Sequence, residues 1–287
     1  MLKLRLITFA LALNLLVALS VPAQTVNLED LYVKGNKVSY NGYEVTRSFN
    51  ESTQLSWASI SKGGRLLVSF KDGGGPSLDF TNIALFSLLG GEGKQLIINQ
   101  HSGGAHCCNS VWIYDLAAPR LRKLYDNLTY DVDFSPLLID IDHDGVYEFT
   151  QSVMAFDYFD RLSHASSPFA QVAFKYDKSA GRYLPASRTH ADYLLRDIGK
   201  YIDEVNKANR ELASTRHEDD VGDYLGTVLQ VVLQYIYAGR EQEGWDFYER
   251  EYRLDDKAQM RTKVKGVLRK SVVYNSIYGR TNRRGSS

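Results

Sequence analysis

The stretch KVSYNGYEV, Lys37 to Val45, predicts a β-hairpin and guides the interpretation of the first half of the chain. Two short runs of alternating apolar and polar residues flank Asn41-Gly42. Asparagine followed by glycine suits a two-residue hairpin turn, because both adopt left-handed backbone angles at small cost. The stretch QLSWASISKGGRLLVSF, Gln54 to Phe70, repeats the pattern with Lys62-Gly63-Gly64 as its turn. We therefore expect antiparallel strands joined by tight turns.

Strand patterns continue to about residue 185. Five further segments are rich in β-branched and aromatic residues, and each is bounded by Gly, Asp, Ser or Pro. They are IALFSLL (83–89), KQLIINQ (94–100), SVWIYDL (110–116), VYEFTQSVM (146–154) and AQVAFKYD (170–177). Gly73-Gly74-Gly75-Pro76 separates the first strands from the later ones. The spacing predicts an antiparallel meander, a sandwich or a partial propeller.

Beyond Arg188 the apolar residues follow a helical period. The four predicted helices carry Leu194, Ile198, Ile202, Val205 and Leu212; then Leu225, Val228, Leu229, Val232, Leu233 and Ile236; then Trp245, Tyr248 and Tyr252; then Met260, Val264, Val267 and Leu268. Gly239 suits a left-handed C-cap, and Asp255-Asp256 suit an N-cap. The pair around Gly239 resembles one tetratricopeptide hairpin; the alternative is a small bundle packed on the β domain. We expect an α+β fold: an N-terminal antiparallel β domain followed by a C-terminal helical segment.

The first residues have the layout of a secretory signal peptide. Lys3 and Arg5 precede an apolar run from Leu6 to Leu19. Val21, Pro22 and Ala23 then supply small residues at the positions where a signal peptide is cleaved. The run is short for a membrane span. We expect cleavage after Ala23 and a periplasmic or secreted protein without a lipid anchor or later membrane span. The alternative is an uncleaved N-terminal anchor.

The charge balance excludes one class of partner. The 287 residues include 34 Lys and Arg and 34 Asp and Glu, for a formal net charge of +0. Removal of the predicted signal peptide leaves the chain slightly acidic. Because proteins that bind nucleic acid carry a basic patch or stripe, this composition does not predict nucleic-acid binding. The length allows one large domain or two smaller ones.

The stretch PLLIDIDHDGVYEF, Pro136 to Phe149, predicts a calcium loop. Asp140, Asp142 and Asp144 alternate, Gly145 permits a sharp turn, and Glu148 closes the pattern. Calcium takes six to eight oxygen ligands, and the carbonyl of Val146 lies where such loops use a backbone oxygen. The loop is not an EF-hand, because its twelfth position is Gln151 and strands are predicted on both sides. The alternative is a solvated acidic turn.

The arrangement D-x-D-x-D-G-x-x-E between strands resembles the calcium loops of FG-GAP repeats, the blade units of integrin α-subunit propellers. The resemblance implies side-chain ligands at Asp140, Asp142 and Asp144, a backbone oxygen at Val146 and a closing carboxylate at Glu148, where the family more often has Asp. It covers about nine residues and one copy. The implied cofactor is one structural Ca²⁺.

Both cysteines of the chain are adjacent, at Cys107 and Cys108. The run SGGAHCC (102–108), the acidic loop and FDYF (156–159) together resemble uncharacterised exported bacterial proteins that carry no known activity. Four interpretations of the cysteines stay open: a vicinal disulfide, a soft-metal site with His101 and His106, a thiol nucleophile activated by one of these histidines, and an inert pair packed beside Trp112 and Tyr114.

Four segments are predicted: a signal peptide (1–23), a β domain (24–188), a helical segment (189–279) and a disordered basic tail (280–287). Asp157 and Asp160 lie among Phe156, Tyr158 and Phe159, a composition that suits either a sugar groove or a solvated strand end. We favour a non-enzymatic envelope-binding module with an envelope protein or a glycan as partner. The alternative is a thiol enzyme, a hydrolase or a zinc- or copper-binding protein that uses His106, Cys107 and Cys108.

Overall fold

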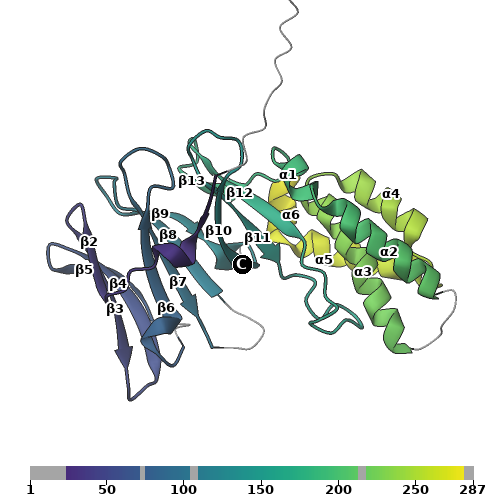
Figure 1. Ribbon diagram of the computed structural model, residues 1–287, viewed down its shortest axis with the longest axis horizontal. Helices are drawn as coiled ribbons and strands as arrows, with labels where there is room; N and C mark the ends of the chain where they lie inside the picture. The colour runs from purple at the N-terminus through teal and green to yellow at the C-terminus, as the bar shows by residue number, and fades with distance from the viewer. Residues whose placement is uncertain (1–23, 72–74, 104–108, 213–217, 281–287) are drawn as a thin grey trace, which may run out of the picture.

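The computed structural model describes residues 24–71, 75–103, 109–212 and 218–280. For residues 134–136 and 218–222 it describes the backbone alone. Strands come first along the chain and helices second (Figure 1). All sheet pairings between the named strands are antiparallel. The predicted α+β fold class is therefore confirmed.

The first sheet is a four-stranded meander formed by β2 (Lys37–Tyr40), β3 (Tyr43–Asn50), β4 (Leu55–Lys62) and β5 (Arg65–Phe70). Its first turn is Asn41-Gly42, with φ of 48° and 75°, and its last is Gly63-Gly64, with φ of 57° and 77°. These left-handed angles are those of two-residue hairpin turns. Both predicted hairpins are confirmed.

The second sheet is another four-stranded meander and lies in the middle of the β region. It contains β6 (Thr81–Phe86), β7 (Gln95–His101), β8 (Asn109–Asp115) and β9 (Arg122–Asp126). One face, with Ile83, Leu96 and Ile98, packs on the first sheet. Alternate residues such as Ala84 and Ile97 pack on the opposite side. Both faces of this sheet are covered, which explains why β7 contains the consecutive apolar residues Leu96, Ile97 and Ile98.

The third sheet has the order β1 (Gln24–Asn27), β10 (Val132–Asp140), β11 (Glu148–Val153), β12 (Gln171–Asp177) and β13 (Arg182–Pro185). Phe149 of β11 pairs with Phe174 of β12. Both rings pack edge-on against Tyr125 of the second sheet, at centroid distances of 4.7 and 5.1 Å. Side chains alternate across a strand, so Glu148 and Lys175, which neighbour this pair, lie on the other face.

Helices cover that other face of the third sheet (Figure 1). They are α1 (Ala191–Leu195), α2 (Ile198–Leu212), α3 (Glu218–Tyr237), α4 (Glu241–Glu251), α5 (Lys257–Lys270) and α6 (Val272–Ile277). Ala173 of β12 packs against Leu194, Leu195 and Ala238. All predicted helix-face residues lie within these helices except Tyr252, the cap residue of α4. The helices form the predicted bundle on the β domain, and Gly239 has the left-handed φ of 86° expected of a C-cap.

The predicted change from strands to helices near residue 188 lies between β13 and α1. The predicted signal peptide and residues 281–287 of the predicted tail lie outside the described residues. Arg280, the first residue of that tail, donates a hydrogen bond to Glu241 Oε2 at 3.1 Å. Within the described ranges, no helix is both long enough and apolar enough to cross a bilayer.

Helix α3 makes close contact with the start of β12 and with the segment that precedes it. The Gln234 side chain accepts from the Gln171 N–H at 2.9 Å and donates to the Gln171 carbonyl at 3.3 Å. A Cβ added at Gly226 would lie 1.9 Å from the Ser166 carbonyl oxygen. Gly226 therefore permits the helix to approach this segment.

We expect Gly226→Ala to lower the free energy of unfolding by about 1–2 kcal/mol, because the clash with the Ser166 carbonyl outweighs the better helix propensity of alanine. Gly266→Ala in α5 is the matched control, since a Cβ there meets nothing within 4 Å. It should raise the free energy by up to about 1 kcal/mol. Chemical denaturation of both variants measures the free energy of unfolding. An equal increase in both variants would contradict the close packing at Gly226.

Candidate metal site

The acidic loop reverses the chain between two neighbouring strands. Asp140 ends β10, Glu148 begins β11, and Ile139 pairs with Glu148 across the ladder. Gly145 has φ of 79°, and its N–H donates to Asp140 Oδ2 at 3.2 Å. The loop therefore curls over the Asp140 carboxylate.

Backbone hydrogen bonds hold two other loop carboxylates, those of Asp144 and Glu148, in place. The Val146 N–H donates to Asp144 Oδ1 at 2.8 Å, and the Ile141 N–H donates to Glu148 Oε2 at 2.9 Å. The second sheet fixes the loop from outside, because the Tyr147 N–H donates to the Leu88 carbonyl at 2.8 Å. The carboxylates are thus oriented by backbone groups of the loop itself.

The three aspartates of the loop converge. One oxygen of each of Asp140, Asp142 and Asp144 lies within 4.8 Å of the others. Asp140 is 7% exposed, and its Oδ1 is buried without a hydrogen-bond partner. Asp142 and Asp144 are exposed. The predicted side-chain ligands at 140, 142 and 144 therefore lie close together. The bond of Val146 to Asp144 is made by its N–H, so the predicted role of the Val146 carbonyl stays a prediction.

A lysine provides the positive charge at this point. Lys175 Nζ lies 2.6 Å from Asp142 Oδ2, 2.8 Å from Asp144 Oδ2 and 3.0 Å from Glu148 Oε1. The first two contacts are hydrogen bonds, whereas the third is an ion pair without hydrogen-bond geometry. Glu148 is 0% exposed. A buried carboxylate without a nearby cation is strongly unfavourable, so Lys175 stabilises this arrangement.

The pKa shifts follow from this arrangement. Burial alone would lower the pKa of Lys175, but its bonds to Asp142, Asp144 and Glu148 outweigh burial and raise it. Burial raises the pKa of Glu148, and the Ile141 N–H and Lys175 offset only part of that effect. For Asp144, burial is outweighed by hydrogen bonds from Lys175 and Val146, and the pKa falls. The ammonium is therefore held in its charged form.

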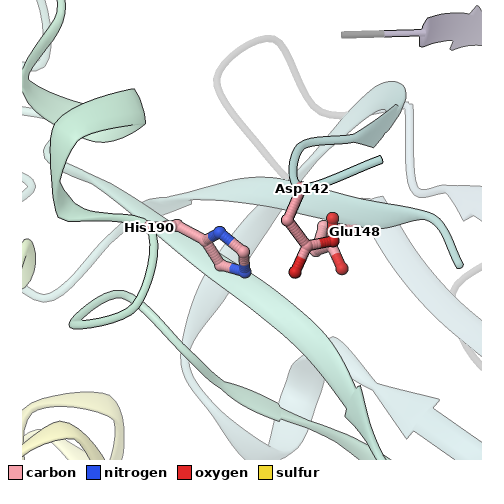
Figure 2. Close-up of side chains that lie close together, drawn as sticks. All are labelled: Asp142, Glu148 and His190. Atoms are coloured by element: carbon pink, nitrogen blue, oxygen red, sulfur yellow. The ribbon is translucent and has the colours of Figure 1, made fainter. Parts of the chain in front are cut away.

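His190 contributes a nitrogen from the turn that precedes α1. Figure 2 shows the imidazole directed at the carboxylates of Asp142 and Glu148. One ligand atom of each of these three residues lies within 4.8 Å of the others. His190 is 5% exposed, its Nε2 is buried without a hydrogen-bond partner, and burial lowers the pKa of the ring. The site thus includes a buried imidazole with an unpartnered ring nitrogen.

Sequence reasoning missed Lys175 and His190. Lys175 lies 33 residues beyond Asp142, in the middle of a predicted strand. His190 lies in a turn between a predicted strand and a predicted helix. No motif links either residue to the loop. Only the pairing of β11 with β12 and the path of the chain into α1 bring them to the carboxylates.

The alternative site predicted at His106, Cys107 and Cys108 lies outside the described residues. His101 ends β7, and its Nδ1 accepts a hydrogen bond from the Gly103 N–H at 3.0 Å. The interpretations of the cysteine pair therefore stay predictions.

The carboxylates near the FDYF segment are paired within the protein. Asp157 Oδ1 lies 2.8 Å from His164 Nδ1, and Asp160 forms an ion pair with Lys263 of α5. Tyr158 is 58% exposed, whereas Phe156 is buried. Asp160 and its partner join the β region to the helices, which is a structural role for that carboxylate.

Comparisons of the chain with family models, with curated proteins and with solved structures gave no match.

We expect Lys175→Met to lower the free energy of unfolding by about 2–3 kcal/mol in the absence of divalent cations, because Glu148 is then buried without a counter-charge. Lys37→Met is the matched control. Lys37 also lies 2.6 Å from a glutamate, Glu44, but both side chains are about half exposed (51% and 44%). Lys37→Met should therefore lower the free energy of unfolding by less than about 1 kcal/mol. Equal losses in urea denaturation would show that Lys175 has no special role.

Proposed function

We propose that this protein is an exported, non-enzymatic binding protein whose β domain is stabilised by one Ca²⁺ in the loop from Asp140 to Glu148. Asp140, Asp142 and Asp144 supply side-chain oxygens, Val146 supplies its backbone oxygen, and Glu148 closes the site. The partner class that we propose is an envelope protein or a glycan. Export is supported by the composition of residues 1–23.

The observation that carries the proposal is the convergence of three aspartates, two of which, Asp140 and Asp144, are held by backbone N–H groups of the loop. Their oxygens lie within 4.8 Å of one another, and one of them, Asp140 Oδ1, is buried and has no hydrogen-bond partner. Like charges this close repel unless a cation neutralises them. Oxygen donors of this kind are what calcium prefers.

Calcium and Lys175 are alternative partners of the same carboxylates. The ammonium contacts Asp142 and Asp144 through single oxygens, and it does not reach Asp140 in any contact that the structure shows. A divalent cation would also engage Asp140. Calcium binding therefore requires that Lys175 withdraw, and the site exchanges one positive partner for another.

The position of the loop favours a stabilising role. Tyr147 in the loop donates its N–H to Leu88 of the β6–β7 connection, and the Tyr183 hydroxyl donates to the Tyr147 carbonyl at 3.0 Å. A cation that tightens the loop therefore tightens the contact between the second and third sheets. The alternative that uses His106, Cys107 and Cys108 has no supporting observation among the described residues.

We expect calcium to raise the melting temperature of the chelator-treated protein. A ligand at 100 times its Kd stabilises the folded state by about 2.7 kcal/mol, which corresponds to a rise of about 5 °C or more. Differential scanning calorimetry with and without CaCl₂ measures this rise.

Asp144→Asn should reduce the calcium-induced rise to less than about half, because it removes a charged ligand. The matched control is Asp203→Asn, which removes an exposed aspartate of α2 and should leave the rise intact. A melting temperature that calcium does not change would exclude the calcium proposal.

A further inference from the structure

A second set of donors overlaps the aspartate cluster. Asp142, Glu148 and His190 each offer a ligand atom within 4.8 Å of the other two (Figure 2). This set shares only Asp142 with the cluster of Asp140, Asp142 and Asp144. Glu148, which closes the proposed calcium site, is also shared. The second set needs neither Asp140 nor Asp144, so substitutions at Asp144 and at His190 can separate the two sites.

The donors of this second set are buried more deeply than those of the loop. Glu148 is 0% exposed and His190 is 5% exposed. His190 Nε2 is buried without a hydrogen-bond partner, whereas the buried Glu148 Oε1 is partnered by the ammonium of Lys175 at 3.0 Å. Buried polar side-chain atoms in folded proteins almost always have a partner. The unpartnered nitrogen of His190, which faces Asp142 and Glu148, therefore points to a ligand at this site.

We propose that Asp142, Glu148 and His190 form a binding site for a divalent transition cation of the Zn²⁺ class. Zinc accepts imidazole nitrogen and carboxylate oxygen together, whereas calcium takes oxygen ligands. Ligands of tetrahedral zinc at 2.0–2.2 Å lie roughly 3.4 Å apart. The three donor atoms therefore need only small side-chain rotations to close on an ion.

Lys175 competes with the metal at this site. Its ammonium lies 2.6 Å from Asp142 Oδ2 and 3.0 Å from Glu148 Oε1. Both oxygens are donors to the proposed ion, and two positive charges so close repel each other. Zinc therefore displaces the ammonium, which is 25% exposed and has solvent to move into. Removal of the ammonium should strengthen zinc binding.

The test measures zinc and calcium on the same variants of the full chain. All variants carry Cys107→Ser and Cys108→Ser, so that thiolates do not bind the metal. Isothermal titration of the chelator-treated protein with ZnCl₂ should show one site. His190→Ala should weaken zinc binding by about tenfold or more and leave the calcium-induced rise in melting temperature unchanged. Asp144→Asn should leave zinc binding unchanged and reduce the calcium-induced rise in melting temperature.

Lys175→Met is the second variant and should bind zinc more tightly than the parent. If a variant does not fold, ¹⁵N-histidine labelling of the parent gives the answer, because zinc should shift the ring nitrogen signals of His190. Zinc affinity unchanged by His190→Ala, unshifted His190 signals in saturating zinc, or no zinc binding at millimolar concentration would each overturn the zinc site. A zinc site without any calcium effect would overturn only the calcium proposal.

Discussion

The ion pairs of Lys175 with Asp142, Asp144 and Glu148 are the interaction on which the rest of the site depends. Glu148 starts β11 with its side chain fully buried, on the face of the third sheet that the helices cover. The backbone N–H of Ile141 satisfies one of its oxygens. The other oxygen, Oε1, is paired with the ammonium of Lys175 from the neighbouring strand. Without a cation at this point, the loop and the start of β11 would be held apart by repulsion.

The stacking of the sheets explains why the loop lies where it does. The second sheet is covered on both faces, and its β6–β7 connection reaches the acidic loop through Leu88 and Gly90. A Cβ at Gly90 would lie 2.9 Å from the Gly145 carbonyl oxygen, so the two turns touch. On the other side, His190 leads the chain into α1. The site therefore joins three parts of the molecule: the second sheet, the third sheet and the helical segment.

Local patterns in the sequence predicted most of the elements, because turns and helix faces depend on neighbouring residues. They missed the short strands β1, β9 and β13 and joined α1 and α2 into one helix. Asn41-Gly42 and Gly63-Gly64 need only their own backbone freedom to form hairpins, and the helical residues from Leu194 onward need only their period. The order of the sheets was not predictable. The return of β1 to pair with β10, more than 100 residues later, leaves no local signature.

The same difference applies to the site. The alternation of Asp140, Asp142 and Asp144 revealed the loop, because those residues are neighbours in sequence. Lys175 and His190 reach it only through strand pairing and helix docking, and each is unremarkable in its own segment. The sequence thus predicted an acidic loop in need of a cation but not the ammonium that neutralises it.

The most direct measurement is a crystal structure of the full chain grown with and without calcium, with anomalous data to identify the ion. The account predicts a cation bound by Asp140, Asp142 and Asp144 at about 2.3–2.6 Å, with Lys175 Nζ withdrawn from Asp142 and Asp144. Without calcium, Lys175 should bond to both aspartates. A loop that retains Lys175 in place and holds no ion at saturating calcium would contradict the exchange of one cation for the other.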